Sequence, residues 1–235
     1  MQRPALLILL LLTLSSSGHA DGVAIGKIYQ PYVQPQEQEL EYRLLYADDI
    51  GSSGRYERHQ FGYGRGLNDR HFAEIYLVVS DGQSGGTDVE GVELEYRYQL
   101  TEQGEYNIDW GIQFELEREF SANIWESSAT ILAQKELGDF SLLGNFSLIY
   151  EFGSGIQNEW ETALSTELRY RWRPEFEPGL ALYAAQNNLA VGPLFGGQIN
   201  TKGVEKWRWE FGAIAGLDNE TPDYSLLFHL EYEFF

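Results

Sequence analysis

The chain ends in Tyr224-Ser-Leu-Leu-Phe-His-Leu-Glu-Tyr-Glu-Phe-Phe235. Every even-numbered position of this stretch is aromatic or leucine, whereas the odd-numbered positions include Ser225, His229, Glu231 and Glu233. A repeat of two residues places successive side chains on opposite faces of a β-strand. The stretch therefore predicts a terminal strand with one wholly apolar face.

This strand resembles the closing strand of Gram-negative outer-membrane β-barrels, which ends in an aromatic residue, any residue and Phe. Tyr232-Glu233-Phe234 fits that signature, and Phe235 places it one residue in from the end of the chain. The resemblance implies a barrel surrounded by outer-membrane lipid. It also implies that the barrel-assembly machinery of that membrane recognises the C-terminal strand.

The first residues predict export. Met1–Ala20 contains Arg3, an unbroken apolar run over Ala5–Leu12 and small residues before Ala20, which is the pattern of a secretory signal peptide cleaved after Ala20. The apolar run is far shorter than the roughly 20 residues that a spanning helix needs. Since no other stretch approaches that length, no helical membrane span is predicted.

The next segment, Asp21–Gln36, contains Pro31 and Pro35 and has no clear period. We interpret it as an irregular N-terminal lead that lies against or inside the barrel. The barrel itself is predicted over residues 37–235.

The composition excludes several classes of function. Asp and Glu number 36 against 16 Lys and Arg, for a net charge of −20. Nucleic-acid binding requires basic patches, so no nucleic-acid partner is expected. The chain has no cysteine, which removes disulfides and thiolate metal sites. An aromatic content of 14% argues against disorder, because disordered chains are poor in aromatic residues.

Alternating segments separated by turn residues fill the rest of the chain, as is typical of a membrane barrel. In order, the predicted strands are 37–46, 55–65, 71–79, 89–100, 106–120, 124–137, 140–152, 159–173, 179–185, 191–199, 206–217 and 224–235. About twelve strands are predicted, with ten as the alternative, because 55–65 and the pair within 179–199 are the weakest. An even number places both termini on the periplasmic side. Gly62 and Gly64 predict a bend or bulge in their strand.

Segment 159–173 carries the clearest internal alternation. Trp160 and Trp172 share its apolar face, and at about 3.4 Å per residue and a tilt near 40° they would lie roughly 30 Å apart along the membrane normal. This spacing is typical of two aromatic girdles around an apolar band. The predicted girdle residues are Trp110, Trp160, Trp172, Trp207, Tyr232 and Phe234.

Alternation alone fits both a soluble β-sandwich and a membrane barrel. Strands of about 10 to 14 residues exceed the soluble norm of about 5 to 6, and Trp and Tyr gather at the strand ends. These features favour an all-β fold, a closed antiparallel up-and-down transmembrane β-barrel, over a soluble exported β protein.

The polar faces then line an enclosed interior. The predicted lumen acids are Glu93, Glu95, Asp109, Glu115, Glu117, Glu159, Glu161, Glu167 and Glu231, and the predicted lumen bases are Arg43, Arg97, Arg169, Arg171 and Arg208. An unpaired buried charge costs several kcal/mol. The lumen therefore holds water, or the acids pair with the arginines and some take up protons. Twelve strands lie between filled eight-stranded barrels and open porins, which predicts either a narrow acidic passage or a salt-bridged plug that conducts nothing.

Three functions follow from this interpretation. The first is a small pore that favours cations or a small cationic solute. The second is a closed structural or assembly barrel that docks a periplasmic partner through Asp21–Gln36. The third is a lipid- or lipopolysaccharide-modifying enzyme that uses His229. No serine follows His229 at the second position, and the nucleophile-elbow and zinc-protease motifs are absent. We therefore predict a non-enzyme with no catalytic residues, no metal and no cofactor. The short connections leave no room for a plug domain.

Overall fold

The computed structural model describes residues 25–48, 55–81, 87–186, 188–201 and 203–235. The predicted signal peptide, Met1–Ala20, lies outside the described residues, as do residues 21–24 of the predicted lead. Within the described ranges, no helix is both long and apolar enough to cross a membrane.

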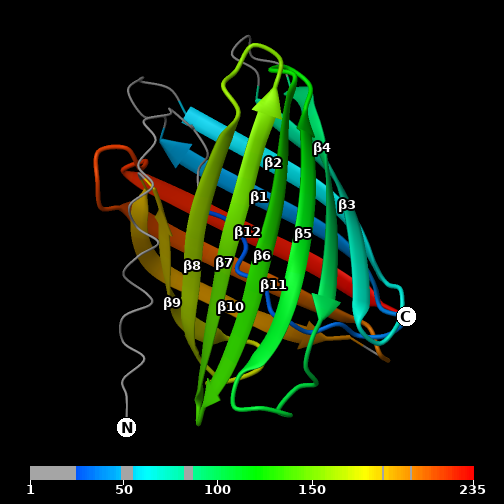
Figure 1. The fold of residues 1–235 in the computed structure, drawn as a ribbon. Helices are drawn as coiled ribbons and strands as arrows, with labels where there is room; N and C mark the ends of the chain where they lie inside the picture. The colour runs from blue at the N-terminus through cyan, green and yellow to red at the C-terminus, as the bar shows by residue number, and fades with distance from the viewer. Residues whose placement is uncertain (1–24, 49–54, 82–86, 187, 202) are drawn as a thin grey trace, which may run out of the picture.

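Twelve antiparallel strands close into one barrel (Figure 1), in which each strand pairs with its neighbours in sequence and the first pairs with the last. The strands are β1 (Gln38–Asp48), β2 (Arg55–Gly66), β3 (His71–Asp81), β4 (Thr87–Gln99), β5 (Asp109–Glu119), β6 (Ile124–Leu137), β7 (Phe140–Gly153), β8 (Glu159–Tyr170), β9 (Glu177–Ala185), β10 (Leu189–Asn200), β11 (Lys206–Gly216) and β12 (Tyr224–Phe234). The predicted closed up-and-down barrel is confirmed, with twelve strands and not ten.

The C-terminal strand closes the barrel. Strand β12 pairs with β1 from Gln38↔Phe234 to Ala47↔Ser225, a pairing called the seam below. The beginning of β1 and the end of β12 therefore lie at the same rim. Closure gives every strand two neighbours, so the barrel has no edge strand whose backbone groups would find no water in lipid.

The two faces of the strands differ in polarity as the alternation predicts. On β1, Leu40 is 52% exposed, whereas its neighbours Glu39 and Glu41 are buried. Other large apolar side chains on the outer face are also exposed, among them Phe61, Ile75, Leu94, Phe146 and Leu180. A soluble sandwich would bury these side chains between two sheets, so that alternative is wrong. The outer surface is an apolar band suited to lipid.

Two predicted strand boundaries are wrong for local reasons. Segment 106–120 becomes strand only at Asp109, because the Asp109 carboxylate accepts the Gly104 N–H at 3.0 Å and holds a turn. Gly104 has a φ of 75°, which favours glycine. Segment 159–173 ends at Tyr170, and a turn closed by an Arg173↔Phe176 bridge follows. Trp172 lies in that turn, so the spacing argument along one continuous strand fails.

The predicted bulge at Gly62 and Gly64 is also wrong. Strand β2 keeps an unbroken register with β3 through both glycines. A Cβ on Gly62 would lie 2.2 Å from the Tyr76 ring, and one on Gly64 would lie 2.8 Å from the Phe72 ring. The glycines make room for these inward side chains. The register irregularity lies between Val78 and Val79, where β3 pairs with β4.

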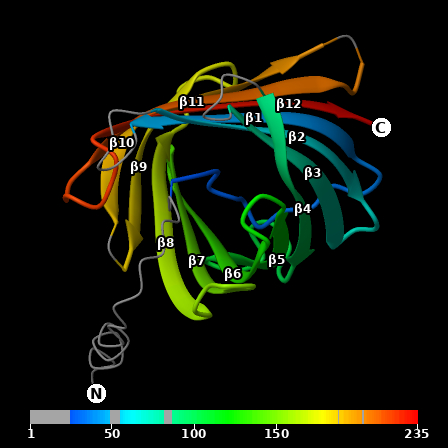
Figure 2. The same cartoon turned by 90° about the horizontal axis from the view of Figure 1, so that it is seen from above.

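Residues 25–36, called the lead below, run without regular structure inside the ring of strands (Figure 2). Ile25 and Ile28 of the lead belong to a buried apolar cluster. The wall side chains of that cluster, called the apolar wall patch, are Leu143, Ala181, Tyr183, Ala190, Leu194, Ile214 and Leu227. The lead therefore covers the inner surface of β7 and β9–β12.

Candidate functional site: the inner face of the barrel

Arg43 is the centre of a buried charge network at the middle of β1. Because Glu41 and Arg43 are two residues apart on one strand, both side chains point inward. The Arg43 guanidinium donates to Glu41 and to Glu95, each at 2.8 Å, and also to the Tyr76 hydroxyl. Its Nη1 donates to the Tyr29 hydroxyl of the lead at 2.8 Å. Four elements, namely β1, β3, β4 and the lead, are thus held by one arginine.

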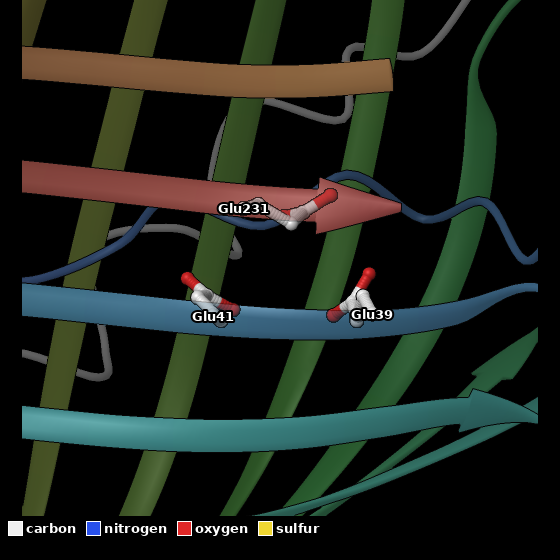
Figure 3. Close-up of side chains that lie close together, drawn as sticks. All are labelled: Glu39, Glu41 and Glu231. Carbon is white, nitrogen blue, oxygen red and sulfur yellow. The ribbon is translucent and has the colours of Figure 1, made fainter. Parts of the chain in front are cut away.

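Three carboxylates meet across the seam (Figure 3). Glu39, Glu41 and Glu231 each place an oxygen within 4.8 Å of the others. The Lys27 ammonium of the lead lies 2.8 Å from Glu41 and 3.3 Å from Glu231. Carboxylate oxygens suit Ca²⁺ or Mg²⁺, but here the cation at Glu41 and Glu231 is the protein's own lysine.

A second arginine network joins β8, β11 and β12. Arg169 donates to Glu167 and to Glu210, each at 2.6 Å. The Nδ1 atom of His229 lies 3.3 Å from Glu210. Removing one partner of such a pair destabilises the protein, because the other charge is then left buried and unpaired.

The remaining predicted bases lie nearer the rims. The Arg208 Nε lies 2.6 Å from a Glu233 carboxylate oxygen, and its Nη1 lies 3.8 Å from Glu231. Arg97 lies 3.4 Å from Glu74, and its Nε donates to Gln113 at 3.1 Å. Arg171 is exposed beyond the end of β8, where it pairs with Glu136 at 2.7 Å.

A row of glutamates runs across five neighbouring strands. The cross-strand pairs are Glu93↔Glu117, Glu117↔Glu126, Glu126↔Glu151 and Glu151↔Glu159, from β4 to β8. These five residues are called the glutamate row. Directly opposite residues have Cβ atoms about 4.5–5.5 Å apart, at which distance like charges destabilise a sheet. Glu126 and Glu159 lie close to the start of β6 and β8, so this part of the row is near the rim opposite the beginning of β1.

Among the described residues, Arg43 and Arg58 form ion pairs with the row, both at the end formed by β4 and β5. Arg58 lies 2.6 Å from Glu117 and 3.6 Å from Glu93, at one end of it. Glu115 comes close as well, since one oxygen of each of Glu93, Glu115 and Glu117 lies within 4.8 Å of the others. Across the described ranges, neither Glu126 nor Glu159 forms an ion pair with another residue. Glu126 and Glu159 therefore present their carboxylates to whatever enters the barrel, and negative charge of this kind raises the local concentration of cations.

The predicted acids separate into two groups. Glu93, Glu95, Asp109, Glu167 and Glu231 are buried, and Glu115, Glu117, Glu159 and Glu161 are partly exposed. Asp109 lies at the rim, where it accepts the Tyr32 hydroxyl at 2.7 Å.

The aromatic residues proposed as girdles lie at the strand ends. Because odd-numbered strands begin at the rim where β1 begins, that rim holds Trp110, Trp207, Tyr232 and Phe234. Trp160 lies at the opposite rim, with its ring 4.5 Å from the Tyr150 ring. Trp172 packs edge-on against Phe176 in its turn.

Sequence reasoning missed Lys27, Tyr29, Tyr76 and Asn145. The lead has no period that would orient its side chains, and its partners come from strands far apart in the sequence. The signal that could have identified Tyr76 is Gly62, because the inward-facing Tyr76 lies directly opposite this glycine.

No family model and no curated protein sequence matches this chain. Solved structures do match. The COG4313 outer membrane channel from Pseudomonas putida F1 is 14% identical, with a TM-score of 0.61 over 89% of this chain and 99% of that one. The KdgM porin, solved in complex with disordered oligogalacturonate, is 11% identical, with a TM-score of 0.57 over 84% and 98%. The NanC porin is 13% identical, with a TM-score of 0.51 over 83% and 99%.

At these identities the matches establish the fold. The twelve-stranded closure, the apolar outer band and the shared fold define a β-barrel of the Gram-negative outer-membrane type. Its surroundings are therefore outer-membrane lipid.

Proposed function

We propose that the protein is a small outer-membrane pore whose acidic inner face favours cations or small cationic solutes. The glutamate row is the observation that carries this proposal. Rings of Asp and Glu side chains are a recurring way to select cations in channels. Because both termini of an even-stranded barrel lie on the periplasmic side, the outer end of the row faces the external opening, where it attracts cations before they enter.

The structural neighbours support a pore, since their names describe channels and porins. The solutes of these neighbours are not assigned to this chain. KdgM was solved with an oligogalacturonate, a polymer that carries carboxylates, whereas the glutamate row of this chain would repel such a polyanion. We therefore infer that this barrel transports solutes through the same architecture, but that it favours solutes of the opposite charge.

The closed structural barrel is the competing proposal. The Arg43 and Lys27 networks favour it, because they fasten the lead inside the barrel. Docking of a periplasmic partner through residues 25–36 requires these residues to leave the barrel wall that they contact. Recognition of β12 by the barrel-assembly machinery is compatible with either function and stays a proposal.

An enzyme is not favoured. His229 pairs with Glu210, and no hydrogen bond between His229 and a serine is found among the described residues. A His–Glu pair alone has no nucleophile to activate.

Solute entry into proteoliposomes tests the proposed function. Vesicles containing the full barrel, or a variant without residues 25–36, are placed in iso-osmotic glucosamine, glucose or glucuronate, three solutes of similar size and different charge. We expect swelling to be fastest with glucosamine and slowest with glucuronate. Equal impermeability to all three in both proteins, or a preference for glucuronate, contradicts the proposal.

A further inference from the structure

The lead is bound to the barrel wall as a ligand would be. Its Lys27 ammonium lies between Glu41 and Glu231 on the two strands of the seam, at 2.8 and 3.3 Å. Both acids are well buried on the inner face. Among the described residues, Lys27 therefore joins Arg43 and Arg208 in neutralising the acidic seam, and it is the cation that lies between Glu41 and Glu231.

Amide contacts hold the backbone of the lead. The Tyr29 N–H donates to Asn145 Oδ1 at 2.7 Å, and Asn145 Nδ2 donates to the Tyr29 carbonyl at 2.9 Å. The Val33 N–H donates to the Gln99 side chain at 2.7 Å, and the Tyr183 hydroxyl donates to the Gly26 carbonyl at 2.9 Å. All of these partners are wall side chains, so the lead can leave without breaking a backbone hydrogen bond between the strands.

Apolar contacts complete the binding surface. Ile25 and Ile28 pack on the apolar wall patch, whose Leu194 and Ile214 are almost fully buried. The lead thus contacts the wall in three ways. Its ammonium lies against carboxylates, its peptide groups bond to polar wall side chains, and its isoleucines pack on the apolar wall patch.

The joint between the lead and β1 lies at the rim. Gln36 has a φ of 65°, in the left-handed region, directly before the first strand. The Glu37 carbonyl accepts the Gly66 N–H at 2.8 Å and fixes the chain just beyond this joint. A rotation about Gln36 would swing residues 25–35 while β1 stays in the sheet.

We propose that residues 25–36 are a tethered blocking segment, with Lys27 bound where a permeating cation would bind, and that the pore opens when this segment leaves the wall. This inference rests on the proposed function, because a blocking segment has meaning only in a pore. The groove that it leaves would bind an extended peptide with one lysine between two isoleucines. Cations inside the barrel compete with Lys27 for Glu41 and Glu231.

Single-channel recording in planar bilayers tests the proposal. The proteins are the full barrel, Lys27→Met, Asn145→Ala and a variant lacking residues 25–36. The matched control is Lys135→Met, which removes the same charge from the outer face of β6. Because breaking a buried ion pair is costly, we expect Lys27→Met to raise the open probability roughly tenfold and the deletion to remove closures. The control should behave as the full barrel does.

Adding the blocker back tests the groove itself. A synthetic peptide of residues 25–36 should block the deletion variant, and the same peptide with methionine at position 27 should block it at least roughly tenfold less well. Folding of each variant is checked by its heat-modifiable migration in gels. A folded deletion variant that gates as the full barrel does overturns the blocking segment and leaves the pore intact. A folded deletion variant that never conducts overturns the pore as well.

An engineered thiol gives an independent measurement. The chain has no cysteine, and a Cβ on Gly26 would meet no atom within 4 Å. Gly26→Cys therefore carries a single biotin without a clash at the Cβ. Streptavidin is too large to enter the barrel, so capture from the periplasmic side, together with a locked open current, is expected if the lead swings out. Absence of capture under conditions in which the channel opens overturns the proposal.

Discussion

The apolar wall patch and the glutamate row lie in one barrel wall and share the same alternation, yet their inner faces have opposite polarity. Leu194, Ile214 and Leu227 of the patch are almost completely buried, because the lead covers them. Glu126 and Glu159 of the row are partly exposed, and the wall supplies them with no ion pair within the described ranges. The polarity of each half of the wall therefore matches what covers it.

The largest effect is expected at the covered side of the seam. Glu41→Gln removes a carboxylate shared by Lys27 and Arg43 and leaves two buried cations with one partner fewer. We expect the free energy of unfolding to fall by about 3 kcal/mol. Guanidinium unfolding from lipid vesicles measures this change, and a stability equal to that of the unmodified barrel would contradict the Lys27 network.

The apolar wall patch should give a smaller loss. Leu194→Ala leaves a cavity beneath the lead, and we expect a loss of about 2 kcal/mol, at the lower end for buried leucines, because the lead can move into the space. The matched control is Leu168→Ala on the lipid face of β8, where the side chain is 41% exposed and lipid fills the space. If both variants lose the same stability in the same unfolding assay, the lead does not pack on the patch.

The glutamate row should respond with the opposite sign. Glu126→Gln removes one of a series of directly opposed like charges, so we expect a gain of about 0.2–1 kcal/mol at neutral pH. The same Glu-to-Gln change thus destabilises the seam and stabilises the row. A loss of stability in Glu126→Gln would mean that an unseen cation partner holds this residue.

Most of the fold was readable in the sequence, because alternation is a local property. Segment 124–137 has the predicted bounds, and the next strand begins after a turn in which Gly138 has a φ of 68°. The errors arose where alternation continues into a turn, as at Trp172, or where glycine serves packing, as at Gly62. A spacer glycine and a bulge glycine look alike until the opposite strand is known.

Less of the site could be predicted. The alternation identifies which residues of a strand face inward, so it correctly places Arg43, Glu95 and Glu231 on the inner face. Parity does not identify partners across a closed barrel. The contact of Lys27 with both Glu41 and Glu231 depends on closure of β1 onto β12 and on an irregular segment, and neither is encoded in a local period.

The zero-current potential across a bilayer with a salt gradient measures the charge preference that we propose for the pore. The barrel without residues 25–36 is compared with the same barrel carrying Glu126→Gln and Glu159→Gln, and with a control carrying Glu175→Gln and Glu220→Gln on exposed turns. We expect a potential of the sign that indicates cation preference, and we expect it to fall with the row substitutions and to be unchanged in the control. Anion preference, or a cation preference that survives loss of the row carboxylates, would contradict it.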